Sequence, residues 1–159
     1  MRYLSIDVGY KNLGWCVFEI DNGNFIYLSS GYIGTNDKKS YPEEFDKQLK
    51  FIYDFFKNII ESCNIKSIVY EKPYFKTGDI GAKVTNVVGV LILLCGMYDL
   101  KEYSYNAITV KKTVSNDAKA DKHKVDCEVC KFLNINPNFK TDHESDAVAV
   151  GITHFKSIF

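Results

Sequence analysis

The sequence predicts an α/β protein with a mixed five-stranded sheet, and two patterns support this prediction. Three runs rich in β-branched and aromatic residues open the chain and are separated by Gly and Asn turns. After them, runs with apolar residues at helical spacing alternate with two further strand-like runs. A strand meander followed by alternating helices and strands gives the order β-β-β-α-β-α-β-α-α, with helices on both faces of the sheet.

The first third of the chain is expected to form the antiparallel part of this sheet. Residues 2–20 contain two apolar runs joined by a turn with Gly9 and Gly14, which is typical of a hairpin. Residues 25–33 form the third strand, because turn residues lie on both sides of them. Asp7 stands inside the first strand, where an acid is costly unless it faces water or a cation.

Two long helices and two strands are predicted for the middle of the chain. A capping box at Ser40 and Glu43 opens a helix that ends near residues 63–64. Strands follow at residues 67–71, which end in Glu71, and at residues 102–107. Between them, residues 78–100 form a helix that is apolar nearly all round. Its second side needs a cover besides the sheet, either another subunit or the last helix.

The last third of the chain is more polar. Residues 109–120 form a basic segment, and residues 121–133 form a short helix followed by a loop that Pro137 shapes. A second capping box, at Thr141 and Glu144, opens the last helix.

Length and composition predict one domain, residues 1–159, that works inside a cell. With 46% apolar and 14% aromatic residues, a folded core is expected rather than disorder. The longest apolar stretch, residues 87–95, is too short to span a membrane, and the N-terminus lacks a secretory leader. Four of the five cysteines lie in apolar or periodic runs, which indicates free, buried thiols in a reducing compartment, the cytoplasm. Cys127 and Cys130 lack a second pair for a zinc site.

Charge is distributed unevenly although the net charge is zero. Residues 66–140 carry 12 basic and 8 acidic side chains, whereas residues 1–65 carry 7 and 9 and residues 141–159 carry 1 and 3. A basic middle flanked by acidic ends fits a protein that contacts phosphates and holds a metal ion. Ordinary scatter of surface charge is the alternative interpretation.

Isolated acids at the ends of predicted elements indicate a metal site. Asp7, Glu71 and Asp146 each stand among apolar neighbours, and Asp142 and His143 lie one helical turn before Asp146. If these groups converge, their carboxylates need a cation, and oxygen ligands suit Mg²⁺ or Mn²⁺. Two such ions about 4 Å apart can promote hydrolysis of a phosphodiester.

Four motifs in the same order resemble the RuvC-type Holliday junction resolvases of the RNase H-like superfamily. They are the Asp-x-Gly hairpin of residues 6–14, the strand-terminal Glu71, the pair Asp146 and Ala147, and the segments 110–114 and 120–122. Within this family, the chain most resembles the poxviral and other large-DNA-virus members. The resemblance covers most of the chain and implies an RNase H-like fold and a crossover junction endodeoxyribonuclease that nicks four-way DNA junctions in recombination and repair. A viral member would work at the viral replication site.

The resemblance also implies roles for individual residues. Asp7, Glu71, His143 and Asp146 would hold two Mg²⁺ or Mn²⁺ ions per active site. Spacing favours His143 because the family's penultimate ligand lies three residues before the last acid, and Asp142 remains the alternative. Two lysines at the family's eleven-residue separation would lie near the scissile phosphate: Lys111 and Lys122.

An aromatic residue and several lysines form the expected DNA-binding surface. Tyr74 holds the position of an aromatic residue that stacks on a base in bacterial relatives, and Phe75 adjoins it. Packing of both rings against the second helix is the alternative. The lysines of this surface are Lys72, Lys76, Lys111, Lys112, Lys119 and Lys122.

Cutting both strands of a junction requires two active sites, so a homodimer is expected, with residues 78–100 as its contact. Other function classes remain open. One is another RNase H-like nuclease acting on RNA–DNA hybrids or structured RNA, and another is a DNA-binding module without catalysis. An actin-like nucleotide-binding fold would need a second Gly-rich loop and a longer chain.

Overall fold

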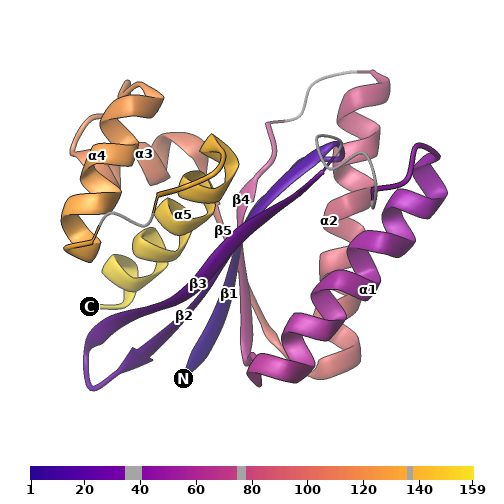
Figure 1. Ribbon diagram of the computed structural model, residues 1–159, viewed down its shortest axis with the longest axis horizontal. Helices are drawn as coiled ribbons and strands as arrows, with labels where there is room; N and C mark the ends of the chain where they lie inside the picture. The colour runs from indigo at the N-terminus through magenta and orange to yellow at the C-terminus, as the bar shows by residue number, and fades with distance from the viewer. Residues whose placement is uncertain (35–40, 75–77, 136–137) are drawn as a thin grey trace.

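The computed structural model describes residues 1–34, 41–74, 78–135 and 138–159 (Figure 1). Five strands form one mixed sheet in the spatial order β3-β2-β1-β4-β5. β1, β2 and β3 are antiparallel neighbours, whereas β4 runs parallel to β1 and to β5. The strand bounds are β1 Arg2–Asp7, β2 Asn12–Asp21, β3 Asn24–Gly34, β4 Ser67–Lys72 and β5 Lys101–Asn106.

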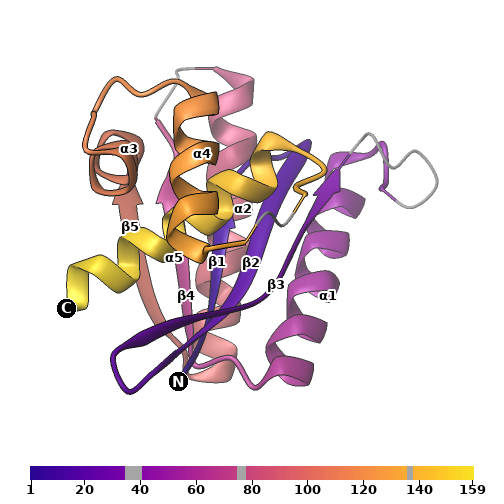
Figure 2. The same cartoon turned by 60° about the vertical axis from the view of Figure 1, so that its left-hand side comes forward.

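Helices cover both faces of the sheet. α1 (Phe45–Cys63) and α2 (Asp79–Tyr98) pack on one face, and α3 (Ala107–Ser115), α4 (Lys122–Leu133) and α5 (Asp142–Ile158) lie on the other (Figure 1). Figure 2 shows α5 crossing the strands obliquely, with α4 outside it. The predicted fold class is confirmed, with one helix more than expected. α3 falls largely in the basic segment, whose few apolar positions were too sparse to predict a helix.

The helix starts differ from the predicted capping boxes. Ser40 lies outside the described residues, and α1 follows Glu44, whose side chain makes no capping hydrogen bond. Thr141 is the N-cap of α5, but its side chain does not cap the helix either. Glu144 is instead buried against β3, where it accepts hydrogen bonds from the Ser30 hydroxyl (2.7 Å) and the Lys140 backbone N–H (3.0 Å).

Side chains alternate between the two faces of the sheet along each strand, and this alternation decides which face the acids at the strand ends point to. Ile6 packs with α1 and α2, whereas Tyr3 belongs to the core beneath α5. Because side chains alternate along a strand, Asp7 faces α5. Val69 of β4 lies in the same core, so Glu71, two residues later, also faces α5. Both acids therefore lie on the α5 side of the sheet.

Small residues bring α5 close to the sheet. A Cβ on Gly151 would lie 2.9 Å from the Phe18 ring and 2.9 Å from Ser5 Oγ. The Ser5 hydroxyl, itself buried, donates a hydrogen bond of 2.8 Å to the Ala147 carbonyl. α5 therefore lies flat on β1 and β2, and its first turn reaches the strand ends.

α2 is covered on one side only. Its four buried residues are Val87, Leu91, Leu94 and Cys95, which join the core shared with α1 and the sheet. α5 lies on the opposite face of the sheet, so the alternative in which the last helix covers the second side of α2 is wrong (Figure 1). Among the described residues, α2 is also the one helix long and apolar enough to cross a membrane by length and composition alone. This helix is longer than the uninterrupted apolar stretch of residues 87–95, because it also includes the smaller and polar residues before that stretch.

The cysteines are free, as predicted, but their burial is uneven. Cys16 and Cys95 are buried, whereas the other three are half-buried: Cys63, Cys127 and Cys130. Burial raises the pKa of Cys95 to about 11, so this thiol stays protonated at neutral pH.

Candidate active site

An acidic site forms where β1 and β4 end beneath the first turn of α5. Asp7 ends β1, and Glu71 is the penultimate residue of β4. His143 Nδ1 lies 2.7 Å from Asp7 Oδ2. Asp146, less than one turn further along α5, interacts electrostatically with both Asp7 and Glu71. The structure thus brings together four residues from three segments that lie far apart in the sequence.

Gly14 allows the first turn of α5 to reach this position. The β1–β2 register pairs Asp7 with Gly14. The backbone of His143 lies directly over that glycine, because a Cβ on Gly14 would stand 1.6 Å from the His143 carbonyl oxygen. Any side chain at this position would push α5 away from β2. The second glycine of the Asp-x-Gly hairpin therefore places His143 against Asp7.

Burial and mutual repulsion alter the titration of the carboxyl groups. Burial, and then the charges of Asp7 and Asp146, raise the pKa of Glu71 to about 7, while Lys111 opposes the shift. Burial, and then the charge of Asp7, raise the pKa of Asp146 to about 6. Carboxylates that repel one another in a partly buried site favour the binding of a cation.

Asp142 and His143, neighbours on the first turn of α5, have different partners. The hydrogen bond with Asp7 raises the pKa of His143, although burial opposes the shift. Asp142 is largely exposed and forms an ion pair of 3.2 Å with Lys122. Of the two neighbours, His143 contacts the acids of the site and Asp142 contacts the lysine.

Two lysines complete the walls of the acidic site. A cavity of about 270 Å³ is lined by Glu71 and Asp146 together with Lys111 of α3 and Lys122 of α4. Burial opposes the charge on Lys122, but the hydrogen bond that Lys122 donates to Asp142 and the charges of the nearby acids raise its pKa. Both lysines are therefore placed to meet an anion that enters over the carboxylates.

The donor set fits a hard divalent cation. Carboxylate oxygens suit Mg²⁺ and Mn²⁺, and an imidazole ligand tilts the preference towards Mn²⁺. Within the described ranges, however, no three of these side chains already form a group arranged to hold one ion. Asp7 and His143 face each other instead.

The predicted DNA-binding residues lie on segments around the cavity. Lys72 is the last residue of β4 and Tyr74 follows the strand; Tyr74 is 89% exposed, so it does not pack against α2. Lys112 at the end of α3 and Lys119 in the α3–α4 connection are both exposed. Two other members of the predicted surface lie outside the described residues: Phe75 and Lys76.

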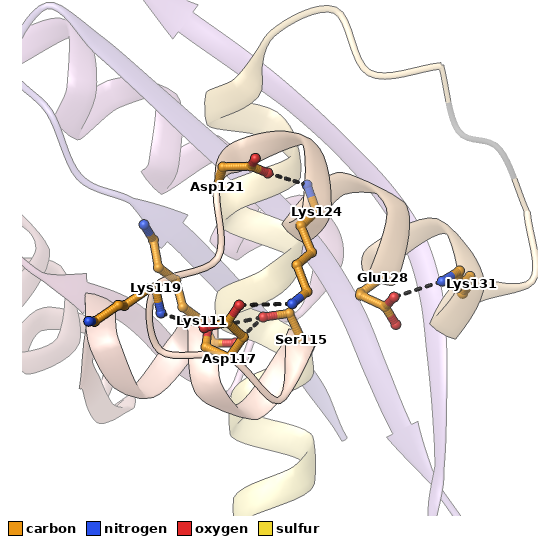
Figure 3. A network of polar contacts seen from close by, with 8 residues as sticks. All are labelled: Lys111, Ser115, Asp117, Lys119, Asp121, Lys124, Glu128 and Lys131. Atoms are coloured by element: carbon orange, nitrogen blue, oxygen red, sulfur yellow. Dashed lines mark hydrogen bonds and ion pairs between the residues drawn. The ribbon is translucent and has the colours of Figure 1, made fainter.

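A polar network that the sequence did not predict holds the α3–α4 connection (Figure 3). Asp117 accepts hydrogen bonds from the Lys119 backbone N–H (2.9 Å) and from Lys124 Nζ (2.8 Å). The Ser115 hydroxyl donates to the carbonyls of Lys111 and Asp117. These bonds tie the loop that carries Lys119 to both helices.

The contact between Ser145 and Asp126 was also not predicted from the sequence. The Ser145 hydroxyl donates to Asp126 of α4 and, at 3.0 Å, to the Asp142 carbonyl. This contact holds α4, and with it Lys122, against the first turn of α5. Asp126 follows Lys122 by four residues, so both lie on one helix face. This four-residue spacing is the one feature of the sequence that could have indicated a role for Asp126 next to Lys122.

The sheet order, with acids from β1, β4 and α5 gathered on one face, places this chain among proteins with an RNase H-like fold. The family model described as crossover junction endodeoxyribonuclease RuvC matches residues 3–154, and the chain belongs to this family. A Finegoldia magna protein with the same description is 33% identical over 155 residues, which cover 97% of this chain and 92% of that relative.

Solved structures share the fold. Thermus thermophilus RuvC in complex with a Holliday junction substrate matches with a TM-score of 0.84 and 20% identity, over 99% of this chain and 94% of that one. The fowlpox virus resolvase with junction DNA matches with a TM-score of 0.59 and 12% identity, over 100% and 99% of the two chains. The similarity to this bacterial RuvC is greater, and the expected virus-like subtype is not confirmed.

Proposed function

We propose that this protein is a metal-dependent crossover junction endonuclease that nicks opposing strands of four-way DNA junctions by phosphodiester hydrolysis. One observation carries the proposal: in a chain of the RuvC family, acids from three separate elements meet His143 beneath two lysines. The same site on the same fold could also serve a nuclease for RNA–DNA hybrids or structured RNA. The experiment below separates these substrates.

Asp7, Glu71, His143 and Asp146 would hold the metal, Mg²⁺ or Mn²⁺, with two ions per site. When bound, the metal activates the attacking water and stabilises the leaving oxygen at the phosphate. The pKa values of Glu71 and Asp146, raised by burial and then by mutual repulsion, support this assignment, because a bound cation offsets both effects. Asp142 is the weaker candidate for a metal ligand, since its side chain is largely exposed and forms an ion pair with Lys122.

The lysines would bind the DNA and offset charge at the reacting phosphate. Lys111 and Lys122 line the cavity with the acids, so their ammonium groups can stabilise the negative charge of the transition state. Lys72, Lys112 and Lys119 are exposed around it and would contact the DNA backbone. Tyr74 would stack on a base. Phe75 and Lys76 complete this proposed surface.

A homodimer would supply the two active sites that paired cutting needs, with α2 as the contact. The exposed positions of α2 are 79, 80, 82, 85, 86, 89, 92, 93, 96 and 97, and from 82 onward they recur at helical spacing. A Cβ on Gly89 or Gly96 would meet nothing within 4 Å, so a second helix could approach closely there. The large apolar side chains on this helix that stay exposed are Ile80, Ile92, Leu93 and Met97. A C₂ axis through this face would pair two copies of one patch.

Three broader assignments complete the proposal. Residues 1–159 would form a single nuclease domain, since the family model matches nearly the whole chain. The protein would be a bacterial-type member rather than a virus-like one, because the similar relatives described above are bacterial. It would act in the cytoplasm, where its five free cysteines stay reduced.

The test is incubation with a synthetic mobile four-way junction, a linear duplex and an RNA–DNA hybrid, each with Mg²⁺ or Mn²⁺. We expect paired nicks in the junction, little cutting of the duplex, and no cutting when EDTA replaces the metal. Asp54→Asn is the matched control, because this acid lies on α1 and pairs with Lys50. Faster cutting of the hybrid than of the junction would favour the alternative substrate. Junction binding without any cutting would contradict both nuclease assignments.

A further inference from the structure

A buried polar contact joins α4 to α5 beside the acidic site. Ser145 of α5 is 1% exposed, and its hydroxyl donates a hydrogen bond to the carboxylate of Asp126 on α4, which is half-buried. The carbonyl of Asp142, 3.0 Å away, is a second acceptor for the same proton, but a carboxylate is the stronger one. This α4–α5 bond is therefore charge-assisted and largely shielded from water.

The α4–α5 bond lies within one or two helical turns of groups that line the acidic cavity. On α4, Lys122 precedes Asp126 by four residues and lies on the same helix face. On α5, Asp146 directly follows Ser145. Lys122 and Asp146 line the cavity together. Any shift of α4 along α5 would therefore change the distance between this lysine and this acid.

Two other kinds of contact between α4 and α5 are less directional or more exposed. Val125 and Val129 are buried in the core that α4 shares with α5, but apolar contacts have no preferred direction. The ion pair of Lys122 with Asp142 also links the two helices. Its two side chains are 61% and 58% exposed, however, and exposed ion pairs are weak. The α4–α5 bond combines direction with burial, so it is the firmer restraint.

Lys122 depends on such a restraint because its side chain has to change partners. In the free protein its ammonium group is paired with Asp142 at 3.2 Å, and it has to turn away to reach a phosphate over the acids. Lys122 is the first residue of α4, whose start Asp121 caps by accepting a hydrogen bond of 2.8 Å from the Lys124 N–H. The cap and the α4–α5 bond hold the base of the lysine side chain, while the exposed ion pair lets the ammonium group move.

We infer that Asp126 is a positioning residue: its bond to Ser145 fixes the start of α4 so that Lys122 reaches the reacting phosphate. The inference rests on the proposed junction-cleaving function and adds to it a residue outside the acidic cavity. Asp126 contacts neither the DNA nor the metal in this assignment. A displacement of about 1 Å can cost about a hundredfold in rate, so even a small shift of α4 is measurable.

Three substitutions separate the bond from the charge of Asp126. This separation is needed because, after burial and the charge of Asp7, the charge of Asp126 also helps to raise the pKa of Asp146. Ser145→Ala removes the bond and keeps the charge. Asp126→Asn removes the charge but keeps an oxygen that accepts a hydrogen bond from Ser145, and Asp126→Ala removes both.

The test measures the single-turnover cleavage rate at saturating junction, the junction dissociation constant and the Tm of each variant. Ser145→Ala and Asp126→Ala should lower the rate by about 10- to 100-fold, the range that loss of an outer partner gives at metal sites. Asp126→Asn should keep the rate within about threefold, and all three should bind the junction within about twofold of the wild type. Glu128→Ala is the matched control, because Glu128 lies on the same helix and pairs with Lys131 at 2.7 Å (Figure 3).

A double-mutant cycle with Lys122→Met tests whether the effect passes through the lysine. Without an ammonium group to position, Ser145→Ala should change the remaining cleavage rate by less than about twofold. A purely structural role of the α4–α5 bond would lower the rate equally in both backgrounds, which would overturn the inference. If Asp126→Ala does not fold, Ser145→Ala and Asp126→Asn still decide between bond and charge.

Failure of the inference can be told apart from failure of the proposed function. A wild-type protein that cuts no four-way junction overturns the proposed function itself. Junction cutting that Ser145→Ala retains within about threefold, or that Asp126→Asn loses as fully as Asp126→Ala, overturns only the positioning role of Asp126. A loss that appears in the junction dissociation constant and not in the rate has the same consequence.

Discussion

α5 and α2 lie on opposite faces of the same sheet and differ in how much of each helix is covered. α5 has 17 residues, and the ten that are buried include Glu144, Thr153 and His154. α2 has 20 residues and is richer in large apolar side chains, yet only four of them are buried. The more polar helix is the one enclosed by protein.

The position of each helix explains the difference. α5 lies between the sheet and the pair α3 and α4, so protein surrounds it on several sides (Figure 2). α2 touches α1 and the sheet and has nothing described outside it (Figure 1). Enclosure partly desolvates Asp146 in α5 and raises its pKa to about 6, whereas α2 keeps an apolar face exposed. The proposed active site and the proposed dimer contact thus lie on opposite faces of the sheet.

The largest expected effect concerns the enclosed side. Asp7→Asn or Glu71→Gln should reduce junction cleavage by at least about a thousandfold, because each removes a proposed metal ligand. Junction binding should stay equal or become tighter, since a negative charge near the phosphate is lost. Gel-shift and cleavage assays on the same junction check both parts. Asp54→Asn on α1 should change neither by more than about twofold, and cleavage retained within about tenfold in Asp7→Asn would contradict the site.

The second-largest expected effect concerns the exposed face of α2. Ile92 is 47% exposed on α2, and Ile92→Glu should raise the dimer dissociation constant at least about a hundredfold, because an unpaired charge would be buried at the contact. Val88→Glu would be a poor test, since Val88 packs partly against the core. The variant should remain folded and still nick single strands slowly, but paired nicking should be lost.

Light scattering at micromolar protein measures this change, with Asn58→Glu on the exposed face of α1 as the control. A wild type that is monomeric both with and without junction DNA would refute α2 as a dimer contact. The nuclease for hybrids or structured RNA would then become the better proposal.

A smaller effect separates two neighbours at the start of α5. His143→Ala should lower cleavage by about 10- to 100-fold, whereas Asp142→Ala should lower it only a few-fold through the loss of its ion pair with Lys122. His143→Asp should retain activity and shift the metal preference from Mn²⁺ towards Mg²⁺. If Asp142→Ala proves the more damaging substitution, Asp142 is the ligand and His143 is a bystander.

The smallest expected effect is on stability and its dependence on pH. The pKa values of Glu71 and Asp146 in the fold, about 7 and about 6, lie above their ordinary values of 4.5 and 3.8. Between these limits the folded state binds more protons than the unfolded state, so the free energy of unfolding falls as the pH rises from about 4 to 7. The raised pKa of His143 acts in the same direction, because its stabilisation is lost above that pKa.

Without metal, these groups should cost on the order of 2 kcal/mol of stability at pH 8 relative to pH 5. Adding Mn²⁺ at about a hundred times its Kd should raise Tm by roughly 5–10 °C at pH 8, and by less at pH 5, where protons compete for the acids. Differential scanning calorimetry with EDTA or Mn²⁺ checks this. Glu71→Gln should flatten the pH slope, whereas Ile92→Glu on α2 should leave it unchanged. Equal Mn²⁺ shifts at the two pH values would contradict a carboxylate site.

The sequence by itself determined the order of the elements and the identity of the acids. Period-two and helical patterns are local, so strands β1 to β5 and helices α1, α2, α4 and α5 could be predicted from neighbouring residues alone. Asp7, Glu71 and Asp146 were recognisable because an acid among apolar residues is costly without a partner. α3 was missed since a short helix with two core positions has too weak a pattern.

Only the tertiary structure decided which groups meet. The contact of His143 with Asp7, and the turn of Asp142 towards Lys122, depend on how closely α5 approaches β2 over Gly14. The exposed face of α2 likewise depends on α5 lying across the other side of the sheet, which no local pattern encodes. Apolar composition states how much surface a helix would bury, whereas the packing of distant segments decides how much of it is covered.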